Sequence, residues 1–280
     1  MKELGYYNGK IGELNEMTVP MNDRACWFGD GVYEAGMCRN YHIFTLDEHV
    51  DRLYRSAAML EITVPVSKQE LKDLLNSLVL KMDTGNLVVY CQVTRGGGPR
   101  NHAYPDGPAN LWVTLRPKEI NPDLGPVSLI TGEDTRFFHC NIKTLNLIPS
   151  VMANEKARRA GCYEHVFYRP GGRVTECSHS NVHIIKNGTF YTAPLDNLIL
   201  PGIARAHLIA ACKRLNIPVS ETPFTVEDLM NADEIITSSS TAPCVRACRV
   251  DGKEAGMKRT DLFSAMHEAI FHEFYAETDG

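Results

Sequence analysis

The sequence predicts an α+β fold that is divided into two domains. Segments with strand-like alternation and segments with helix-like spacing follow one another along the chain, with no repeat of fixed period. The segment Arg116–Pro126 holds three prolines and a glycine and is otherwise largely polar, as interdomain linkers often are. We therefore expect a small N-terminal α/β domain over residues 1–118, a linker over 119–124, and a larger, β-rich C-terminal α/β domain over 125–280.

Four segments of the N-terminal half have the composition of strands. Residues 31–40 and 41–46 are expected to form a short β pair that turns near Arg39-Asn40. Asn86–Thr94 and Asn110–Leu115 are dense in Leu and Val, which favours two further strands. The N-terminal half should therefore contain a small sheet.

Two helices of the same half are predicted by capping boxes, in which a Ser or Thr and a Glu three residues later bind each other's backbone N–H groups. Thr45 and Glu48 have this spacing, and Ser67 and Glu70 repeat it. Apolar residues at intervals of three and four follow both boxes, as on the buried side of an amphipathic helix. We expect a helix to begin at each box.

The C-terminal half alternates strands and helices. Its expected strands are Val127–Thr131, Tyr163–Tyr168, Asn181–Lys186, Thr189–Ala193 and Glu234–Ser238. Its expected helices are Ser150–Ala160, which Gly161 ends, Ile203–Asn216 and Asp261–Tyr275. Asn187-Gly188 and Asp251-Gly252 are dipeptides typical of tight β turns.

Composition and charge restrict the kind of protein. Lys and Arg number 29 against 34 Asp and Glu, and the net charge of −5 lacks the basic balance of nucleic-acid-binding proteins. No apolar run approaches the roughly 18 residues of a membrane span, and the first residues lack the apolar region of a signal peptide. The nine scattered cysteines are expected to be reduced. We expect a soluble, cytoplasmic protein that binds neither nucleic acid nor membrane.

Two motifs do not predict a site. Gly96-Gly97-Gly98 follows a strand, but the registers of phosphate-binding glycine loops are absent. His267 and His272 flank Glu268 with one residue more than the zinc motif HExxH. At 100° per residue these histidines project about 140° apart on a helix, so they cannot share a metal ion. We expect surface histidines and no metal.

The segment Arg95–Ala109 is the first candidate functional segment. It connects two expected strands, is too long for a tight hairpin, and carries Arg100, His102 and Tyr104 among its Gly and Pro residues. Loops longer than about 12 residues in compact domains tend to be functional or disordered. The alternative is that these are ordinary polar residues of an exposed loop.

Lys143 is the second candidate. It is the only charged side chain between His139 and Glu155, and its neighbours are largely apolar. Such surroundings disfavour a charged ammonium, and Schiff-base chemistry requires a neutral amine. The alternative is a lysine whose stem lies on apolar surface while its ammonium reaches water.

Three polar segments of the C-terminal half could complete a binding site. Arg173–Asn181 places small polar residues, Ser178 among them, around Glu176 and between two strand-like stretches. Leu200–Arg205 has a glycine at a helix start, where free N–H groups and the helix dipole suit a phosphate. Thr237–Thr241 places hydroxyls directly after a strand. The plainer interpretations are an exposed loop, an ordinary helix start and a polar turn.

A lysine, an acidic partner and two sets of phosphate donors are together what pyridoxal phosphate (PLP) requires, since this cofactor needs a Schiff base and a partner for its pyridine nitrogen. The chain resembles the fold-type IV PLP enzymes, and within them the D-amino acid aminotransferases. The resemblance covers nearly the whole chain and rests on segments that occur in the same order: Phe28-Gly-Asp-Gly-Val-Tyr-Glu34, His49-Val-Asp-Arg-Leu-Tyr-Arg-Ser56, Gln92-Val-Thr-Arg-Gly, Pro99-Arg-Asn-His102, Asn141-Ile-Lys-Thr-Leu-Asn146, Val174-Thr-Glu176 and Thr237-Ser-Ser-Ser-Thr241.

The resemblance implies a role for each cofactor-binding candidate. Lys143 would form the Schiff base and move the proton between Cα and C4′, and Glu176 would pair with the pyridine nitrogen. Arg52, otherwise interpreted as a helix-surface charge, would bind the phosphate with its planar set of donors. The remaining cofactor-binding residues would be Ser178, Leu200 against the ring, the backbone N–H groups of Ile203 and Ala204, and the hydroxyls of Ser239 and Ser240.

The resemblance also implies a substrate site and a partner. Tyr33, Arg100 and His102 would bind the substrate α-carboxylate. Arg100 and His102 would come from the neighbouring subunit, so the active protein would be a homodimer. Three residues depart from the pattern. Ala204 stands where a threonine often helps to hold the phosphate, His179 lies in the usually serine-rich run after Glu176, and Ala35 stands where a larger apolar residue is common.

The expected protein is therefore a PLP-dependent aminotransferase that exchanges an amino group between a D-amino acid, of the D-alanine or D-glutamate class, and a 2-oxo acid such as 2-oxoglutarate or pyruvate. A branched-chain L-amino acid aminotransferase and an aminodeoxychorismate lyase remain alternatives on the same fold. An alternative of another class is a binding protein that keeps this fold but has lost the cofactor and the catalytic activity. The presence of Lys143, Glu176 and Arg52 argues against it.

Overall fold

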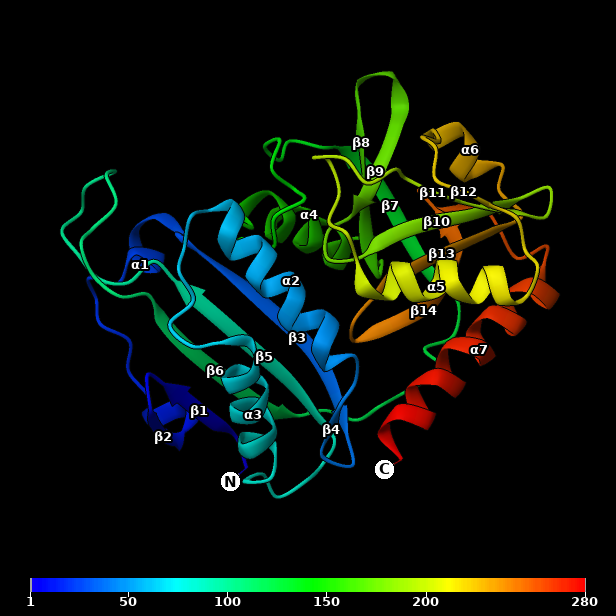
Figure 1. The fold of residues 1–280 in the computed structure, drawn as a ribbon. Coiled ribbons are helices and arrows are strands. Elements are labelled where there is room, and N and C mark those ends of the chain that lie inside the picture. The colour runs from blue at the N-terminus through cyan, green and yellow to red at the C-terminus, as the bar shows by residue number, and fades with distance from the viewer. Residues whose placement is uncertain (1, 280) are drawn as a thin grey trace. The chain divides into compact units, whose positions relative to one another are not determined.

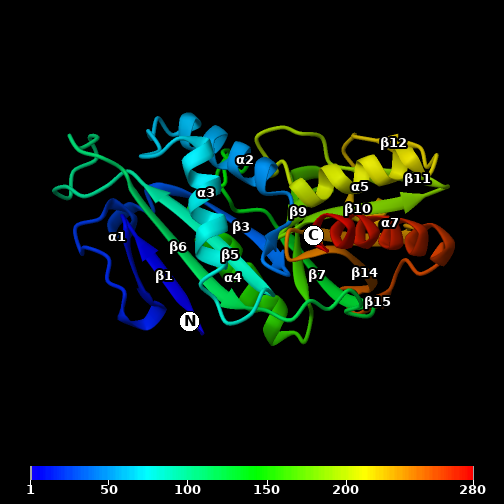
Figure 2. The ribbon, with the colours of Figure 1, turned by 60° about the horizontal axis from the view of Figure 1, so that its bottom comes forward.

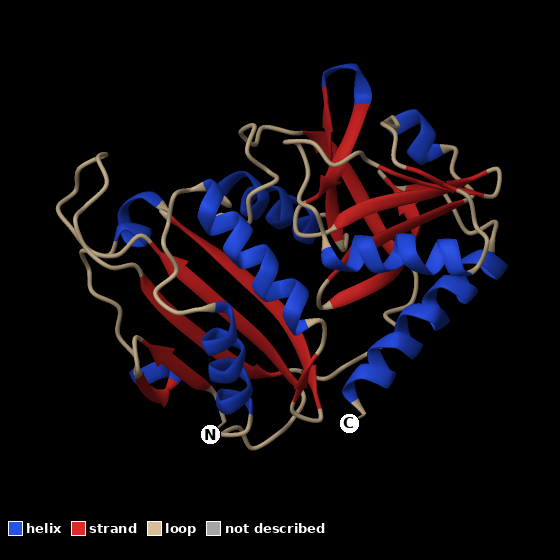
Figure 3. Cartoon of the chain, in the orientation of Figure 1, coloured by secondary structure: helices blue, strands red, loops and turns tan. Residues whose placement is uncertain are grey.

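The computed structural model describes residues 2–279, and the chain divides into two compact units. The first unit comprises Met1–Ile120, Ile142–Asn146 and Phe274–Gly280, and the second comprises Asn121–Asn141 and Leu147–Glu273. Each unit has its own sheet (Figures 1 and 3). The first division falls within the expected linker. The two short segments, one of which carries Lys143, belong to the first unit although they come from the part of the chain beyond that linker.

The described part of the first unit contains an antiparallel six-stranded sheet in the order β2-β1-β6-β5-β3-β4. Its strands are β1 (Leu4–Tyr7), β2 (Lys10–Glu13), β3 (Gly31–Arg39), β4 (His42–Ile43), β5 (Leu87–Thr94) and β6 (Asn110–Pro117). The four predicted strands are confirmed. The β1–β2 hairpin was not predicted. It turns at Asn8-Gly9, where the two residues have positive φ angles of 45° and 95°.

Two amphipathic helices, α2 (Leu46–Met59) and α3 (Lys68–Val79), pack against this sheet, and a short helix α1 (Arg24–Phe28) precedes β3 (Figure 2). Leu53, Leu71 and Leu78 are fully buried in the core between helices and sheet. The capping box of α3 is confirmed, because Glu70 N–H donates to Ser67 Oγ and Ser67 N–H donates to the Glu70 carboxylate. Local sequence thus determines where α3 begins.

The capping box predicted at Thr45 is wrong, although a helix does begin at Leu46. Thr45 has a left-handed backbone (φ 51°), and its hydroxyl donates to the carbonyl of Phe44. Its backbone N–H donates at 2.8 Å to Oε1 of Glu277. A carboxylate far along the chain therefore takes the place that the prediction gave to Glu48.

The second unit contains, in its described residues, a nine-stranded mixed sheet in the order β12-β11-β10-β13-β14-β7-β8-β9, with β15 paired to β14. Its strands are β7 (Val127–Glu133), β8 (Glu164–Arg169), β9 (Arg173–Cys177), β10 (Asn181–Lys186), β11 (Thr189–Thr192), β12 (Val219–Ser220), β13 (Glu234–Ser239), β14 (Ala242–Val250) and β15 (Lys253–Glu254). The parallel pair β7–β8 is joined by the helix α4 (Ile148–Arg159). The five predicted strands are confirmed, whereas β9, β12, β14 and β15 were not predicted.

The other helices of this unit are α5 (Ile203–Arg214), α6 (Val226–Met230) and α7 (Thr260–Thr278), whose last residues belong to the first unit. Leu208 of α5 and Met266 of α7 are fully buried in one apolar cluster with residues of the sheet. The predicted turn at Asn187-Gly188 is confirmed by positive φ angles of 52° and 77°. In the described residues, no helix combines the length and the apolar character needed to cross a bilayer.

Candidate active site

Lys143 lies on a short segment that extends the sheet of the first unit along β3. The N–H of Tyr33 donates to the carbonyl of Lys143 at 3.0 Å, and the N–H of Lys143 donates to Oγ of Ser56 at 3.3 Å. An isolated β bridge joins Val32 to Thr144, the next residue. The Lys143 side chain is half-buried, and its Nζ lies 4.3 Å from the centre of the Tyr33 ring. The structure therefore brings two predicted site residues together and fixes the lysine through its backbone.

Arg52 lies on the buried side of α2. Its side chain pairs with the carboxylate of Glu34, with Nε 2.7 Å from Oε1 and Nη2 2.9 Å from Oε2. His49 Nδ1 lies 2.6 Å from the same carboxylate. Burial alone would raise the pKa of Glu34, but Arg52 and His49 lower it to about 2. The helix-surface interpretation of Arg52 is wrong, because the residue is only 3% exposed.

Arg100 and His102 lie on the exposed loop between β5 and β6. The Arg100 guanidinium lies 5.4 Å from the centre of the Phe28 ring, and the His102 ring lies 5.3 Å from it. Phe28 is the last residue of α1. The structure therefore places both predicted carboxylate-binding residues on one aromatic side chain, which the sequence pattern did not indicate.

Glu176 is the centre of the predicted site residues in the second unit. Its Oε1 accepts from Nη1 of Arg136, and its Oε2 accepts from Asn181 Nδ2 at 3.0 Å and from Leu200 N–H at 2.9 Å. The exposed-loop interpretation of this segment is wrong, because Glu176 lies in β9 and is buried. Burial raises the pKa of Glu176, whereas the Arg136 guanidinium and the Leu200 N–H oppose that rise.

Arg136 contacts the predicted site residue Glu176, and the sequence reasoning did not identify it. It donates to both oxygens of Asp134, at 3.0 and 2.9 Å, as well as to Glu176. Burial would raise the pKa of Asp134, but the hydrogen bonds and charge of Arg136 lower it. Arg136 thus contacts two buried carboxylates, and Asp134 also pairs with Arg169, whose Nε lies 3.2 Å from Oδ2. The only local signal was an acidic and a basic residue two positions apart at the end of a strand.

Asn181 connects Glu176 to the start of α5. Its Nδ2 donates to Glu176 and also to the carbonyl of Leu200 at 3.0 Å. A Cβ at Gly202, the N-cap of α5, would lie 2.0 Å from Oδ1 of Asn181, so a larger residue here would require the Asn181 side chain to move. Asn181 also pairs with Ser238 across strands β10 and β13. These contacts bring the carboxylate, the helix start and the end of β13 together.

The remaining predicted residues lie around the same place. Ile203 and Ala204 form the first turn of α5, where backbone N–H groups have no acceptor within the helix. Ser239 ends β13 and its Oγ accepts from Ala242 N–H, and Ser240 follows in the turn. The hydroxyl of Ser178 instead lies 3.3 Å from oxygens of both Glu164 and Asn154.

These residues fit the two polar ends of PLP. A buried carboxyl group with a guanidinium beside it suits a protonated ring nitrogen. The first turn of α5, with glycine at its N-cap, suits a phosphate, and the hydroxyls at the end of β13 add donors. The predicted site residues thus form two groups: one around Tyr33 and Lys143 in the first unit, and one around Glu176 in the second.

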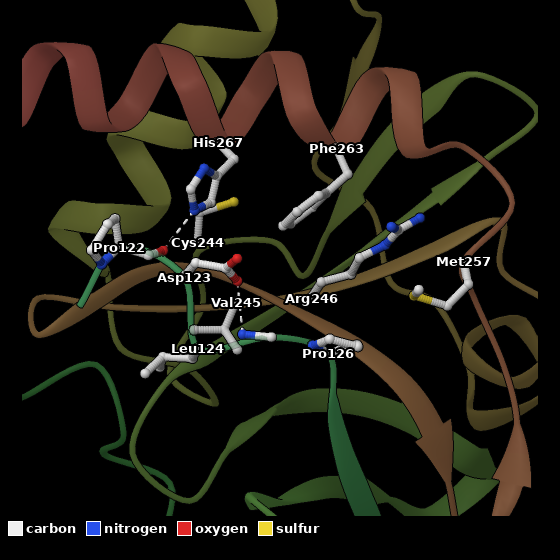
Figure 4. Close-up of a pocket in the computed structure, with 11 residues that line it drawn as sticks. Pro122, Asp123, Leu124, Pro126, Cys244, Val245, Arg246, Met257, Phe263 and His267 are labelled. Carbon is white, nitrogen blue, oxygen red and sulfur yellow. Dashed lines mark hydrogen bonds between the residues drawn. The ribbon is translucent and has the colours of Figure 1, made fainter.

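A cavity of about 160 Å³ in the second unit contains none of the predicted site residues. Residues 122–126, just before β7, form one wall, and side chains of β14 and α7 form others (Figure 4). His267 Nε2 lies 2.7 Å from the carbonyl oxygen of Pro122, and its ring packs between Phe263 and Phe271. His267 is therefore a partly exposed histidine with a backbone partner, whereas His272 is exposed.

The sequence matches the model of one protein family, amino-transferase class IV, over residues 31–250. D-alanine aminotransferase of Listeria monocytogenes serotype 4b is 43% identical over 277 residues, which cover 95% of this chain and 94% of that protein. D-alanine aminotransferase of Bacillus licheniformis is 38% identical, with 89% of each chain covered.

Solved structures agree on the fold. The branched-chain amino acid aminotransferase of Escherichia coli superposes with a TM-score of 0.90 at 23% identity, over 99% of this chain and 96% of that one. A protein from Legionella pneumophila described as a putative 4-amino-4-deoxychorismate lyase gives a TM-score of 0.85 at 22% identity, over 92% of this chain and 97% of that one. The expected α+β fold of fold-type IV enzymes is confirmed. The chain belongs to the class IV aminotransferases.

Proposed function

We propose that this chain is a PLP-dependent D-amino acid aminotransferase, which exchanges an amino group between a D-amino acid such as D-alanine or D-glutamate and a 2-oxo acid such as 2-oxoglutarate or pyruvate. The observation that carries the proposal is the pairing of Arg100 and His102 on Phe28, in a loop whose Pro-Arg-x-His sequence is typical of the D-amino acid branch. The names of the relatives, D-alanine aminotransferase at 36–43% identity, support it.

The chemistry divides between the cofactor and the residues of this chain. Bound PLP supplies an electron sink for the negative charge that develops at the amino acid Cα. Lys143 would move the proton between Cα and C4′, since its amine is carried by a short segment whose backbone is fixed beside β3. Glu176 would accept a hydrogen bond from the ring nitrogen and hold the proton there, and Arg136 opposes the rise in the pKa of Glu176 that burial causes.

The other predicted residues would bind and orient. Arg52 and the N–H groups of Ile203 and Ala204 would hold the phosphate. Tyr33, Arg100 and His102 would bind the substrate carboxylate. The last group of proposed cofactor contacts comprises Leu200 against the ring and the hydroxyls of Ser178, Ser239 and Ser240.

We also propose that the active protein is a cytoplasmic homodimer, in which Arg100 and His102 serve the partner's site. The exposed side of α4 supports association, because Ile148, Val151 and Met152 are 70%, 58% and 58% exposed and follow helical spacing. The nine cysteines are free thiols, as is usual in a reducing compartment.

The function is tested by an absorption spectrum of the protein with PLP, to which D-alanine and L-alanine are added separately. We expect a visible band that D-alanine bleaches and L-alanine does not. Bleaching by branched-chain L-amino acids alone would contradict the proposal in favour of the branched-chain alternative. Pyruvate release from aminodeoxychorismate without an amino acceptor would favour the lyase, and no visible band at all would favour a cofactor-free binding protein.

Replacement of Arg100 tests the carboxylate site. We expect Arg100→Ala to raise KM for D-alanine by a factor that corresponds to about 1–3 kcal/mol, because a hydrogen-bonded charge pair with the substrate is lost. Steady-state kinetics measures this change. Arg116→Ala is the matched control, since Arg116 is an exposed arginine of β6 whose contact with Glu3 is 3.8 Å long. Equal KM values in both variants and the parent would contradict the assignment.

The same variant tests the proposed homodimer. Each mixed dimer of an Arg100→Ala subunit and a Lys143→Ala subunit would contain one site with both residues intact. After random exchange of subunits, about a quarter of all sites should regain the parental KM. No gain on mixing, with exchange verified by a mass tag, would show that Arg100 acts within its own subunit.

A further inference from the structure

Arg24, the first residue of α1, is a buried arginine that binds the loop Arg95–Ala109. It is 3% exposed. Its Nη1 donates to the carbonyls of Asn101 and Ala103 at 2.5 and 3.1 Å, and its Nη2 lies 3.4 Å from the carbonyl of His102. One guanidinium therefore contacts three consecutive carbonyl groups of an otherwise exposed loop segment.

Arg24 is itself held in place by a buried ion pair. Its Nε donates to Oδ2 of Asp30 at 2.7 Å, and Nε of Arg95 donates to the same oxygen at 2.9 Å. Arg95 also donates to the carbonyls of Leu60 and Glu61 at the end of α2. Because these groups are little exposed, Arg24 has a defined position from which to hold the loop.

The base of the loop is fixed by the residues beside Arg24. The N–H of Arg24 donates to the carbonyl of Gly96 at 3.0 Å, and the N–H of Gly98 donates to the carbonyl of Asn22 at 3.1 Å. The carboxylate of Asp23 accepts from both strands that flank the loop, at Thr94 and Asn110. The two ends of the loop thus have their own anchors, and the part beyond them is contacted by Arg24.

Phe28 connects this arrangement to the side chains of the loop. The Arg24 guanidinium lies 4.8 Å from the centre of the Phe28 ring, on which Arg100 and His102 also lie. Arg100 and His102 flank Asn101, whose carbonyl makes the short bond to Arg24. The positions of Arg100 and His102 therefore depend on Arg24 through both the backbone and the aromatic ring.

We propose that Arg24 is a positioning residue: by binding the carbonyls of residues 101–103, it keeps Arg100 and His102 together in the arrangement that binds the substrate carboxylate. The proposal rests on the carboxylate-binding role of these two residues given above. A loop that is ordered in advance loses less conformational freedom on binding, so Arg24 contributes to affinity without touching the substrate.

The test compares Arg24→Met with the parent enzyme in two measurements. We expect KM for D-alanine to rise about tenfold with kcat within about twofold, because ordering of the loop is then required at binding. We expect trypsin to cleave after Arg100 about tenfold faster, because the loop opens more often. The second measurement needs no activity, and mass spectrometry identifies the cleaved bond.

Two further variants separate positioning from general stability. Arg24→Lys keeps a cation beside Asp30, but a lysine cannot bind three carbonyls with a planar set of donors. It should therefore show the same faster cleavage of the loop as Arg24→Met. It replaces Arg24→Met in the test if that variant fails to fold. Arg39→Met is the matched control, since Arg39 also pairs with an aspartate and packs on an aromatic ring, Tyr275, and does not contact the loop. It should change neither measurement.

The outcomes are distinct. In a background of Arg100→Ala and His102→Ala, Arg24→Met should have little further effect on KM, because residues that act through one another are not additive. A full tenfold rise in that background, or unchanged KM and unchanged cleavage in the Arg24 variants, would overturn the proposal. If Arg100→Ala alone leaves KM unchanged, the carboxylate role fails, and the cleavage rates still decide whether Arg24 holds the loop.

Discussion

Lys143→Ala is expected to abolish transamination while the fold remains intact. No other group of the predicted site supplies a primary amine, so we expect a loss of more than about 1,000-fold in kcat/KM with D-alanine and 2-oxoglutarate. The hydrogen bonds that place this segment beside β3 are made by the backbone of Lys143, which alanine retains. Steady-state rates and thermal melts of the variant and the parent test both statements.

A control variant and a chemical rescue show whether the loss of activity is due to the missing amine of Lys143. Lys156→Ala removes an exposed lysine of α4 and should leave kcat/KM within about twofold. Added methylamine should restore part of the Lys143→Ala rate if the amine is needed to move the Cα proton. An Lys143→Ala enzyme that retains transamination at a rate comparable to the parent would refute the catalytic assignment, whereas loss of the fold in the melt would leave Lys143→Arg as the variant to measure.

Helix starts and turns that depend on a short sequence motif could be predicted from the sequence. The capping box at Ser67 and the turn at Asn187-Gly188 each depend on residues that lie within four positions of one another. A short stretch of sequence is therefore enough to predict them. Thr45 shows the limit of this reasoning. Thr45 and Glu48 have the spacing of a capping box, yet the backbone N–H of Thr45 donates to Glu277 and not to Glu48. A sequence window of four residues contains no information about a carboxylate 232 positions away.

The candidate site shows the same limit. The motifs identified Lys143 and Glu176 because each stands out against its neighbours in the sequence. Arg136 and Arg24 were missed because their importance comes from burial and from partners on other segments, which are properties of the folded chain. The return of residues 142–146 to the first unit is made by backbone hydrogen bonds to β3. Backbone pairing of this kind leaves no pattern in composition.

Glu176→Gln is expected to lower kcat/KM by about 10- to 100-fold, because an amide cannot hold a proton at the ring nitrogen and a charged hydrogen bond is worth about 1.5–3 kcal/mol. The matched control is Glu234→Gln, since Glu234 is also a fully buried carboxylate of the second unit, paired with Arg246 at 2.5 and 2.6 Å. Both variants should lose stability, and only Glu176→Gln should lose activity at a temperature well below its melting point.

The role of Arg136 gives this prediction its pH dependence. Burial raises the pKa of Glu176, and the Arg136 guanidinium opposes that rise. In Arg136→Met the opposing charge is gone, so the pKa of Glu176 rises further and the carboxyl group is protonated over a wider range of pH. A protonated Glu176 has no negative charge with which to hold the proton on the ring nitrogen. The acid limb of the plot of kcat/KM against pH should therefore move to higher pH in Arg136→Met. It should not move in Glu234→Gln. An unmoved acid side in Arg136→Met, in a protein that still melts cooperatively, would mean that the ionisation of Glu176 does not limit the reaction.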